Sequence, residues 1–393
     1  MDTKLKSLLL AQQVCCLLTF EDMVDFYRKN LPYLKDYTII SATNYRNSID
    51  LYSAFADVEG IKNHLHTPFI DGKVNVVNHQ ILKRLHWKNK VYTGMQYCVS
   101  FDTQTVSYFN RYYRKKDISL PTDISTFVQL LYNQNISVDY IPYSMENLLF
   151  SNKDSDSIYD TIYTFERLYY RENKSKSYCD EKTKQILTWY KKMRDKNGSR
   201  FTDLYNSVYI ALLKMCYIQL AHPSLSVDKK MENICEFMNS TVSQMLYPEL
   251  ILAHNFFQKG QRYNFFGKIQ KGRSDIIQSI KNMAWDLFHL RMLEVDCGFK
   301  NHNEANAVIP CFFTYDERLK NIRDCYALKG IAINEKTHES TPVYANITQI
   351  IPYITKYSNE INVIRRVNHR SQINIYNIIE ALEKNINEIN QTI

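Results

Sequence analysis

The sequence is poor in the two residues that interrupt regular structure, with only nine Gly and nine Pro among 393 residues. Because these residues make most tight turns, their scarcity argues against a chain built from many short hairpins. Hydrophobic residues, at 45%, suffice for packed cores. We therefore expect long regular elements and a predominance of helix.

Paired cysteine motifs are also missing. The nine Cys are an odd number, and no two are separated by the two-residue gap of a zinc knuckle or a redox pair. Most lie among apolar residues, where a thiol behaves as a small hydrophobe. This usage predicts reduced thiols and a cytoplasmic protein.

No run of apolar residues approaches the length of about 18 that a spanning helix needs. The nearest candidate, Leu8–Phe20, contains two glutamines, lacks a small-residue cleavage site and leads directly into two acidic residues. We expect no membrane segment, and an amphipathic helix over residues 1–35 instead.

A basic excess is present, with a formal charge of +8 that is spread along the chain. Such a charge attracts polyanions and favours nucleic acid as a partner, although it does not determine a fold.

The apolar patterns divide the chain into regions 1–95, 96–330 and 331–393, with a helical insertion over about 150–275 in the second. Strands are expected at Val74–Val77, Met95–Phe101 and Ala307–Phe313, with further short strands after residue 331. Helices are expected at 123–134, 143–150, 158–171, 181–194, 204–221, 228–246, 249–258, 275–294 and 373–390.

Carboxylates follow two of the expected strands. Asp102 ends the first and Asp316 the second, and ligands of open α/β sheets bind beyond such strand ends. A third carboxylate, Asp286, has apolar neighbours, where an unpaired charge is costly. Since clustered carboxylates repel, a divalent cation bound through oxygen would stabilise them.

Three motifs in this order resemble the PIN-like nucleases. Phe101–Tyr108 resembles the first strand end of that family, although Gln104 stands where the family favours Asn. Met283–Leu293, with Asp286 and His289, resembles its Asp-containing helix, and Thr314–Asp316 resembles its closing Thr-x-Asp. The resemblance covers about 96–150 and 275–325.

The resemblance implies an α/β, helix-rich fold in which a PIN-like core with a small, mainly parallel sheet carries a large helical insertion. It implies a metal-dependent endoribonuclease that hydrolyses RNA phosphodiester bonds. Asp102, Asp286 and Asp316 would bind Mg²⁺ or Mn²⁺, Glu146 would complete the acidic site with Glu166 as second choice, and Thr314 would orient a ligand or water. A toxin or phage-defence effector, controlled by a regulatory protein, would share this chemistry.

Each residue also has a structural alternative. Asp102 could cap a helix beginning near Thr103, Asp286 could pair with a basic residue, and Asp316 could belong to a turn. Glu146 could be a solvated helix residue and Thr314 an ordinary strand residue. Neighbouring arginines could explain Glu166 as a surface residue. The alternative function is a non-catalytic RNA- or protein-binding module with structural carboxylates.

One segment, Phe256–Arg273, interleaves five aromatic with five basic residues. Basic groups neutralise phosphates while aromatics stack on bases, so this segment is a candidate RNA-binding surface. Its binding residues would be Arg262, Lys268, Lys271 and Arg273. The alternative is an amphipathic packing element with its aromatics in the core. The same two interpretations apply to Lys83, Arg84, Trp87, Lys88 and Lys90.

Overall fold

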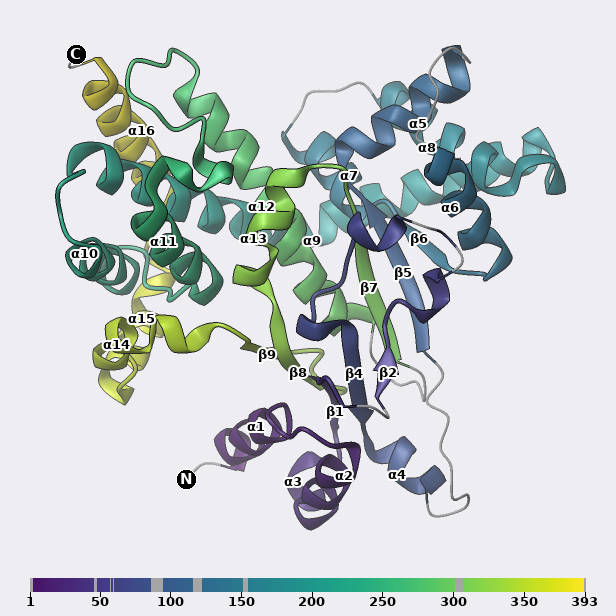
Figure 1. Cartoon of the computed structure of the whole chain (residues 1–393), viewed down its shortest axis with the longest axis horizontal. Helices are drawn as coiled ribbons and strands as arrows, with labels where there is room; N and C mark the ends of the chain where they lie inside the picture. Colours follow the sequence, from purple (N-terminus) through teal and green to yellow (C-terminus); the bar gives the residue numbers. More distant parts are fainter. Residues whose placement is uncertain are drawn as a thin grey trace. The chain divides into compact units, whose positions relative to one another are not determined.

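The computed structural model describes residues 3–45, 48–56, 58, 60–85, 95–115, 122–150, 155–300 and 307–391. In this part of the chain it shows a helix-rich α/β protein with two small sheets (Figure 1), which confirms the expected class. Two compact units are present. Unit 1 comprises Met1–Ser199, His289–Tyr315 and Leu328–Val343, and unit 2 comprises Arg200–Phe288, Asp316–Ala327 and Tyr344–Ile393. The three sequence regions stay a prediction.

A four-stranded sheet in unit 1 has the order β3-β7-β5-β6. Its central strand β5 (Met95–Phe101) pairs in parallel with β7 (Ala307–Phe313) and with β6 (Ser137–Asp139), while β3 (Leu65–His66) is antiparallel to β7. The sheet is therefore mainly parallel. Strands β5 and β7 have the predicted bounds.

Phenylalanine side chains form the core beside the ends of these strands. Phe101 and Phe313 lie with ring centroids 5.8 Å apart, and Phe127 stacks on Phe313 at 4.8 Å. Phe127 comes from α6 (Thr122–Asn133), and Phe165 of α8 (Ser155–Tyr170) packs against Phe101 at 5.2 Å. The close packing of these buried rings fixes the position of the last residue of each strand, and therefore also the position of the residue that follows it.

A second sheet in unit 1 has the order β2-β4-β1-β8-β9, and β1 pairs antiparallel with both β4 and β8. Only parts of this sheet were expected, because β1 pairs with strands that lie far from it in the chain. The strands are β1 (Tyr37–Ala42), β2 (Ile49–Asp50), β4 (Lys73–Val77), β8 (Leu328–Asn334) and β9 (Ser340–Tyr344).

Gly330 of β8 allows the N-terminal segment to lie close to this sheet. A Cβ at this position would come within 2.6 Å of the Cβ of Cys15, closer than side-chain atoms approach one another. Only glycine fits here.

The predicted continuous helix over 1–35 is wrong. Three helices occupy this segment, namely α1 (Thr3–Val14), α2 (Phe20–Lys29) and α3 (Leu31–Leu34). The break before α2 is stabilised by Thr19, whose side chain accepts a hydrogen bond from the Asp22 amide at 3.0 Å. An N-cap of this kind satisfies an amide that a starting helix leaves unpaired.

The opposite error occurs at α9 (Lys176–Ala221), a single 46-residue helix where two were predicted. Its Asn-Gly-Ser sequence at residues 197–199 does not end it, because one interior glycine costs only about 1 kcal/mol relative to alanine. The other helices of unit 1 are α4 (His79–Leu85), α5 (Thr103–Lys115) and α7 (Ile141–Met145), followed by a π-helical turn at Glu146–Phe150.

Unit 2 is mainly helical in the residues described. Figure 1 shows α10, α11, α14, α15 and α16 gathered in this unit. Its helices are the end of α9, α10 (Val227–Ser240), α11 (Tyr247–Lys259), most of α12 (Ile276–Lys300), α13 (Glu317–Tyr326), α14 (Ile351–Ile354), α15 (Glu360–Arg370) and α16 (Ile375–Gln391). Across the described residues of both units, every helix is too short or too polar to cross a bilayer.

Candidate functional site

The carboxyl ends of β5 and β7 are joined by Asp102 and Thr314. The two strands are in register at Phe101 and Phe313, so the next residues lie side by side. The Asp102 amide donates to the Phe313 carbonyl at 3.2 Å, and the Thr314 hydroxyl donates to Asp102 Oδ2. Both side chains are buried. This contact between Asp102 and Thr314 was not itself predicted, and the metal-site roles expected for the two residues stay predictions.

Asp102 also caps α5. Its Oδ1 accepts a hydrogen bond from the Thr105 amide at 2.5 Å, and the helix begins at Thr103. This is the structural alternative considered for Asp102, and it is what the structure shows. A cap and a ligand role are compatible, because an ionised carboxylate accepts about four hydrogen bonds or ligand contacts.

Glu146 lies beside the start of the same helix. Its Oε2 accepts a hydrogen bond from the Thr103 hydroxyl, and its side chain is 25% exposed. It is thus not the solvated helix residue of the alternative interpretation. Glu146 therefore contacts the Thr103 side chain and Asp102 the Thr105 amide, both in the first turn of α5.

His289 Nε2 is 3.8 Å from Glu146 Oε2, within the range of an ion pair. Burial, however, lowers the pKa of His289 to about 3, so the imidazole is neutral at pH 7. We therefore regard the contact as packing rather than a salt bridge. The ring also lies edge-on to Phe312 of β7, with centroids 5.2 Å apart.

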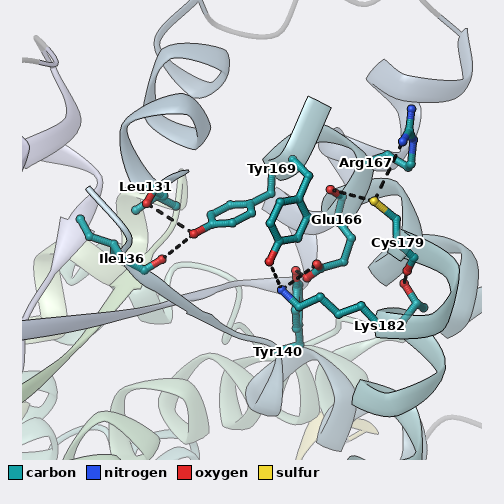
Figure 2. Close-up of polar contacts among 10 residues, drawn as sticks. Leu131, Ile136, Tyr140, Glu166, Arg167, Tyr169, Cys179 and Lys182 are labelled. Carbon is teal, nitrogen blue, oxygen red and sulfur yellow. Dashed lines mark hydrogen bonds and ion pairs between the residues drawn. The ribbon is translucent and has the colours of Figure 1, made fainter. Parts of the chain in front are cut away.

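Glu166, the second choice for the acidic site, has a different role. It is buried at 3% exposure, accepts a hydrogen bond from the Tyr140 hydroxyl at 2.8 Å, and pairs with Lys182 at 3.0 Å (Figure 2). The expected surface explanation is wrong, since its partner is neither of the neighbouring arginines. Burial and the Glu166 charge raise the pKa of Tyr140 well above its usual range. Glu166 and Lys182 therefore form a structural ion pair.

Sequence reasoning missed Asp139, which ends β6 at the same edge of the sheet. Its partner in register is Ser100 of β5. Its Oδ1 accepts hydrogen bonds from the Ile141 amide at 2.7 Å and the Tyr190 hydroxyl at 3.3 Å. A three-residue strand is too short to show an alternating pattern, so the sequence carried little signal for it.

In unit 2, Asp286 and Asp316 share one cation, Arg318. Arg318 Nε donates to the two oxygens of Asp316 at 3.0 and 3.1 Å, and its Nη2 also contacts Asp316. Nη2 is 4.0 Å from Asp286 Oδ2. The ion-pair alternative for Asp286 is therefore what the structure shows.

Asp316 is the N-cap of α13 and accepts from the Arg318 amide at 2.8 Å. Burial alone would raise the pKa of Asp316. The Arg318 hydrogen bonds and charge, together with the charge of Lys268, outweigh burial and hold that pKa below its usual range. The carboxylate is thus ionised and neutralised by arginine.

Asp102 belongs to unit 1, whereas Asp286 and Asp316 belong to unit 2. The predicted convergence of all three carboxylates stays a prediction. Within the described ranges, His, Cys, Asp and Glu side chains form no group of three or more arranged to hold a metal ion.

The aromatic residues of Phe256–Arg273 are buried, which confirms the packing alternative and contradicts base stacking. Phe256, Phe265 and Phe266 are at most 1% exposed, and Phe256 stacks on Phe266 at 3.8 Å. The basic residues Arg262, Lys268 and Lys271 are exposed. Arg273 instead forms hydrogen bonds with Asp275 at 2.8 and 2.9 Å.

In the other basic segment, Lys83 and Arg84 are exposed on α4, while Trp87, Lys88 and Lys90 lie outside the described residues.

Comparisons of the chain with protein families, with curated proteins and with solved structures find no match.

Proposed function

We propose that the chain is a divalent-metal-dependent endoribonuclease with a PIN-like core. The observation that carries the proposal is the Asp102–Thr314 hydrogen bond, which joins the carboxyl ends of two adjacent parallel strands. Ligands of α/β sheets bind at such edges. A buried carboxylate and hydroxyl, with Glu146 beside them, supply the polar groups that such a site requires.

The donor chemistry fits Mg²⁺ or Mn²⁺, which prefer carboxylate and hydroxyl oxygens. Asp102, Asp286 and Asp316 would hold the metal, and Glu146 would complete the acidic set. Along the chain, Asp316 follows Thr314 by two residues, and Asp286 precedes His289 by one helical turn of α12. This closeness in sequence favours a shared site. When bound, the metal would lower the pKa of a water molecule and stabilise charge on the reacting oxygens.

The residues of the chain have distinct roles in this proposal. Thr314 orients the Asp102 carboxylate by donating to Oδ2, and the Thr105 amide holds its other oxygen. Thr103 positions Glu146 in the same way. Arg318 neutralises Asp316 and has to release at least one carboxylate oxygen before Asp316 can serve as a ligand.

The test is an RNA cleavage assay with and without Mn²⁺, comparing the wild type with Asp102→Asn. Asparagine caps helices as well as aspartate, so the fold should survive. Outer-shell partners of a metal alone are worth about 10–100-fold, so loss of a ligand should reduce cleavage by more than about a hundredfold.

Asp50→Asn is the matched control, because Asp50 accepts a backbone hydrogen bond from Tyr52 at 2.8 Å in the other sheet of unit 1. It should cleave RNA as the wild type does. Full activity of Asp102→Asn would contradict the proposal.

A second function has its own supporting observation. Asp102 and Asp316 both cap helices, and Arg318 pairs with Asp316. These structural roles are sufficient to explain why carboxylates occupy the two positions. A non-catalytic RNA- or protein-binding module would need nothing more. RNA binding without Mn²⁺-dependent cleavage, unchanged in Asp102→Asn, would favour this module.

A further inference from the structure

Helix α15 (Glu360–Arg370) is attached to unit 2 by polar side chains. Arg366 donates to Asn239 Oδ1 at 2.9 Å and to the Tyr357 carbonyl at 2.8 Å. Arg370 donates to the Val242 carbonyl at 2.9 Å. Residues of α15 that are four apart lie on one face, so Asn362, Arg366 and Arg370 form its inner face.

The outer face of α15 is apolar. Ile361 is 80% exposed, Ile364 52% and Val367 70%, and the helix has no buried residue. This arrangement reverses the usual one, in which a surface helix turns its apolar face inward. Large residues exposed together on one face mark an interaction surface more often than residues scattered singly.

The outer face follows a coiled-coil pattern. Ile361 and Ile364 are three apart and Asn368 follows at the next turn, which are the a, d and a positions of a heptad. Glu360 then takes a g position and Arg365 the following e position. The inner residues Asn362, Arg366 and Arg370 fall at b, f and c, the positions that face away from a coiled-coil partner.

We propose that this face pairs with α15 of a second copy of the chain, as a short parallel two-stranded coiled coil. In a parallel pair, the g residue of one helix meets the e residue five positions on in its partner. Glu360 therefore lies opposite Arg365 of the other copy, twice per dimer by symmetry. A polar Asn at an a position, as at Asn368, favours pairs and fixes their register.

Charge complementarity favours a second copy over a lipid surface. Membrane-surface helices present Lys and Arg beside the apolar face. Here Arg366 and Arg370 point inward and donate to groups of unit 2, so they are not available to anionic lipid headgroups. The outer face instead carries one acid and one base, Glu360 and Arg365, both exposed.

The pair should be weak. An 11-residue helix is about 16 Å long, and it cannot supply the roughly 800 Å² per partner of a standard interface. Association should therefore depend on concentration, with dimers forming in the micromolar range or above.

The test is sedimentation analysis of the full chain from low micromolar to hundreds of micromolar concentration. The wild type should shift from monomer to dimer. Ile364→Glu should weaken association by about a hundredfold or more, because it removes an apolar contact from both copies and places like charges together. Leu18→Glu, at a residue 61% exposed in unit 1, is the matched control and should associate normally.

Charge exchange makes the test specific for the parallel geometry. Glu360→Arg and Arg365→Glu should each weaken self-association several-fold, since each creates two like-charge contacts. An equimolar mixture of the two variants should associate better than either alone, and the double variant should recover the wild-type constant. Circular dichroism should be unchanged throughout, because the residues are exposed.

A wild type that stays monomeric at every concentration would overturn the proposal. So would dimers that persist in Ile364→Glu, or a mixture no stronger than the single variants. Binding of the monomeric chain to anionic phospholipid vesicles, abolished by Ile364→Glu, would assign the face to a membrane surface instead.

Discussion

The carboxylate of Glu166 is buried among tyrosine side chains and depends on one ammonium group. The Lys182 ammonium lies 3.0 Å from this carboxylate, as Figure 2 shows. It also donates a hydrogen bond to the Tyr170 hydroxyl at 2.6 Å. A buried ion pair contributes little net stability, because the cost of removing two charges from water offsets their attraction. Removing one of them is costly, because the other is left uncompensated.

We predict that Lys182→Met lowers the free energy of unfolding by about 3 kcal/mol, since it leaves a buried carboxylate without its cation. The double variant Glu166→Gln with Lys182→Met should recover most of that loss, because it buries no charge. Urea denaturation of the four proteins gives the double-mutant cycle. A double variant whose loss equals the sum of the losses of Glu166→Gln and Lys182→Met would show that the two residues are not coupled.

The same pair predicts a pH dependence. Burial would lower the pKa of Lys182, but the charge of Glu166 and the hydrogen bonds that Lys182 donates to Tyr170 and Glu166 outweigh burial and raise that pKa. A raised lysine pKa contributes stability that is present below the unfolded value of about 10.4 and is lost as pH rises through the folded value. The stability difference between wild type and Lys182→Met should thus be constant near neutrality and decrease only in strong alkali.

At the scale of elements, helix starts account for much of the candidate site. Asp102 begins α5 and Asp316 begins α13, each by accepting a backbone amide. A capping side chain fixes both where a helix begins and where its own carboxylate lies.

Two substitutions separate the cap of α13 from the Arg318 pair. Asp316→Asn keeps the cap and loses the charge, whereas Asp316→Ala loses both. We predict that Asp316→Ala is less stable than Asp316→Asn by about 1 kcal/mol, the usual value of an N-cap. Thermal unfolding measures the difference. Equal stabilities would mean that the cap contributes nothing and that the ion pair alone holds Asp316.

Strands β5 and β7 could be predicted to the residue because each is a mainly apolar run followed by a polar residue, although Gln96 and Ser100 interrupt the run in β5. A buried parallel strand leaves this mark in a sequence. The short strand β6 leaves none, and the pairing of β1 with β8 joins segments nearly 300 residues apart in the chain. Such pairings depend on tertiary packing, which local patterns do not record.

The candidate site, like the strands, could be predicted from sequence only in part. Asp102 could be placed at the carboxyl edge of the sheet from sequence, because parallel strand ends gather there, whereas its contact with Thr314 was not predicted. The contacts of Thr103 with Glu146, Lys182 with Glu166 and Arg318 with Asp286 could not be foreseen, because a side-chain contact between separate segments has no local pattern. The aromatic residues near Phe256 were ambiguous for a related reason, since a core helix and a stacking surface have the same spacing.

For the whole molecule, the net charge of +8 is the property that bears on a polyanionic substrate. The exposed residues Arg262, Lys268 and Lys271 belong to unit 2, and Lys268 is close enough to lower the pKa of Asp316. A positive surface near a carboxylate would offset its repulsion of phosphate.

We predict that replacing Arg262, Lys268 and Lys271 by Ala weakens RNA binding and flattens its salt dependence, by about 0.7 in log–log slope for each phosphate that the variant no longer neutralises. Cleavage at saturating RNA should change little, because these basic groups serve binding. Titration at several salt concentrations measures the slope. Replacement of the exposed Lys191, Lys192 and Lys196 is the control for loss of charge. An effect equal to that of the control would remove any special role of the segment.

The accessibility of the cysteine thiols can be used to follow unfolding of the chain. Of nine free cysteines, Cys16 is exposed and the other eight are buried. Burial raises the pKa of Cys235 to about 12 and that of Cys325 to about 11, which suppresses the thiolate that alkylating reagents attack. The folded protein should therefore take up one maleimide and the denatured protein nine, as counted by mass spectrometry. A dye can thus be placed at Cys16 in the unaltered sequence, and Cys16→Ser should remain unlabelled until it unfolds.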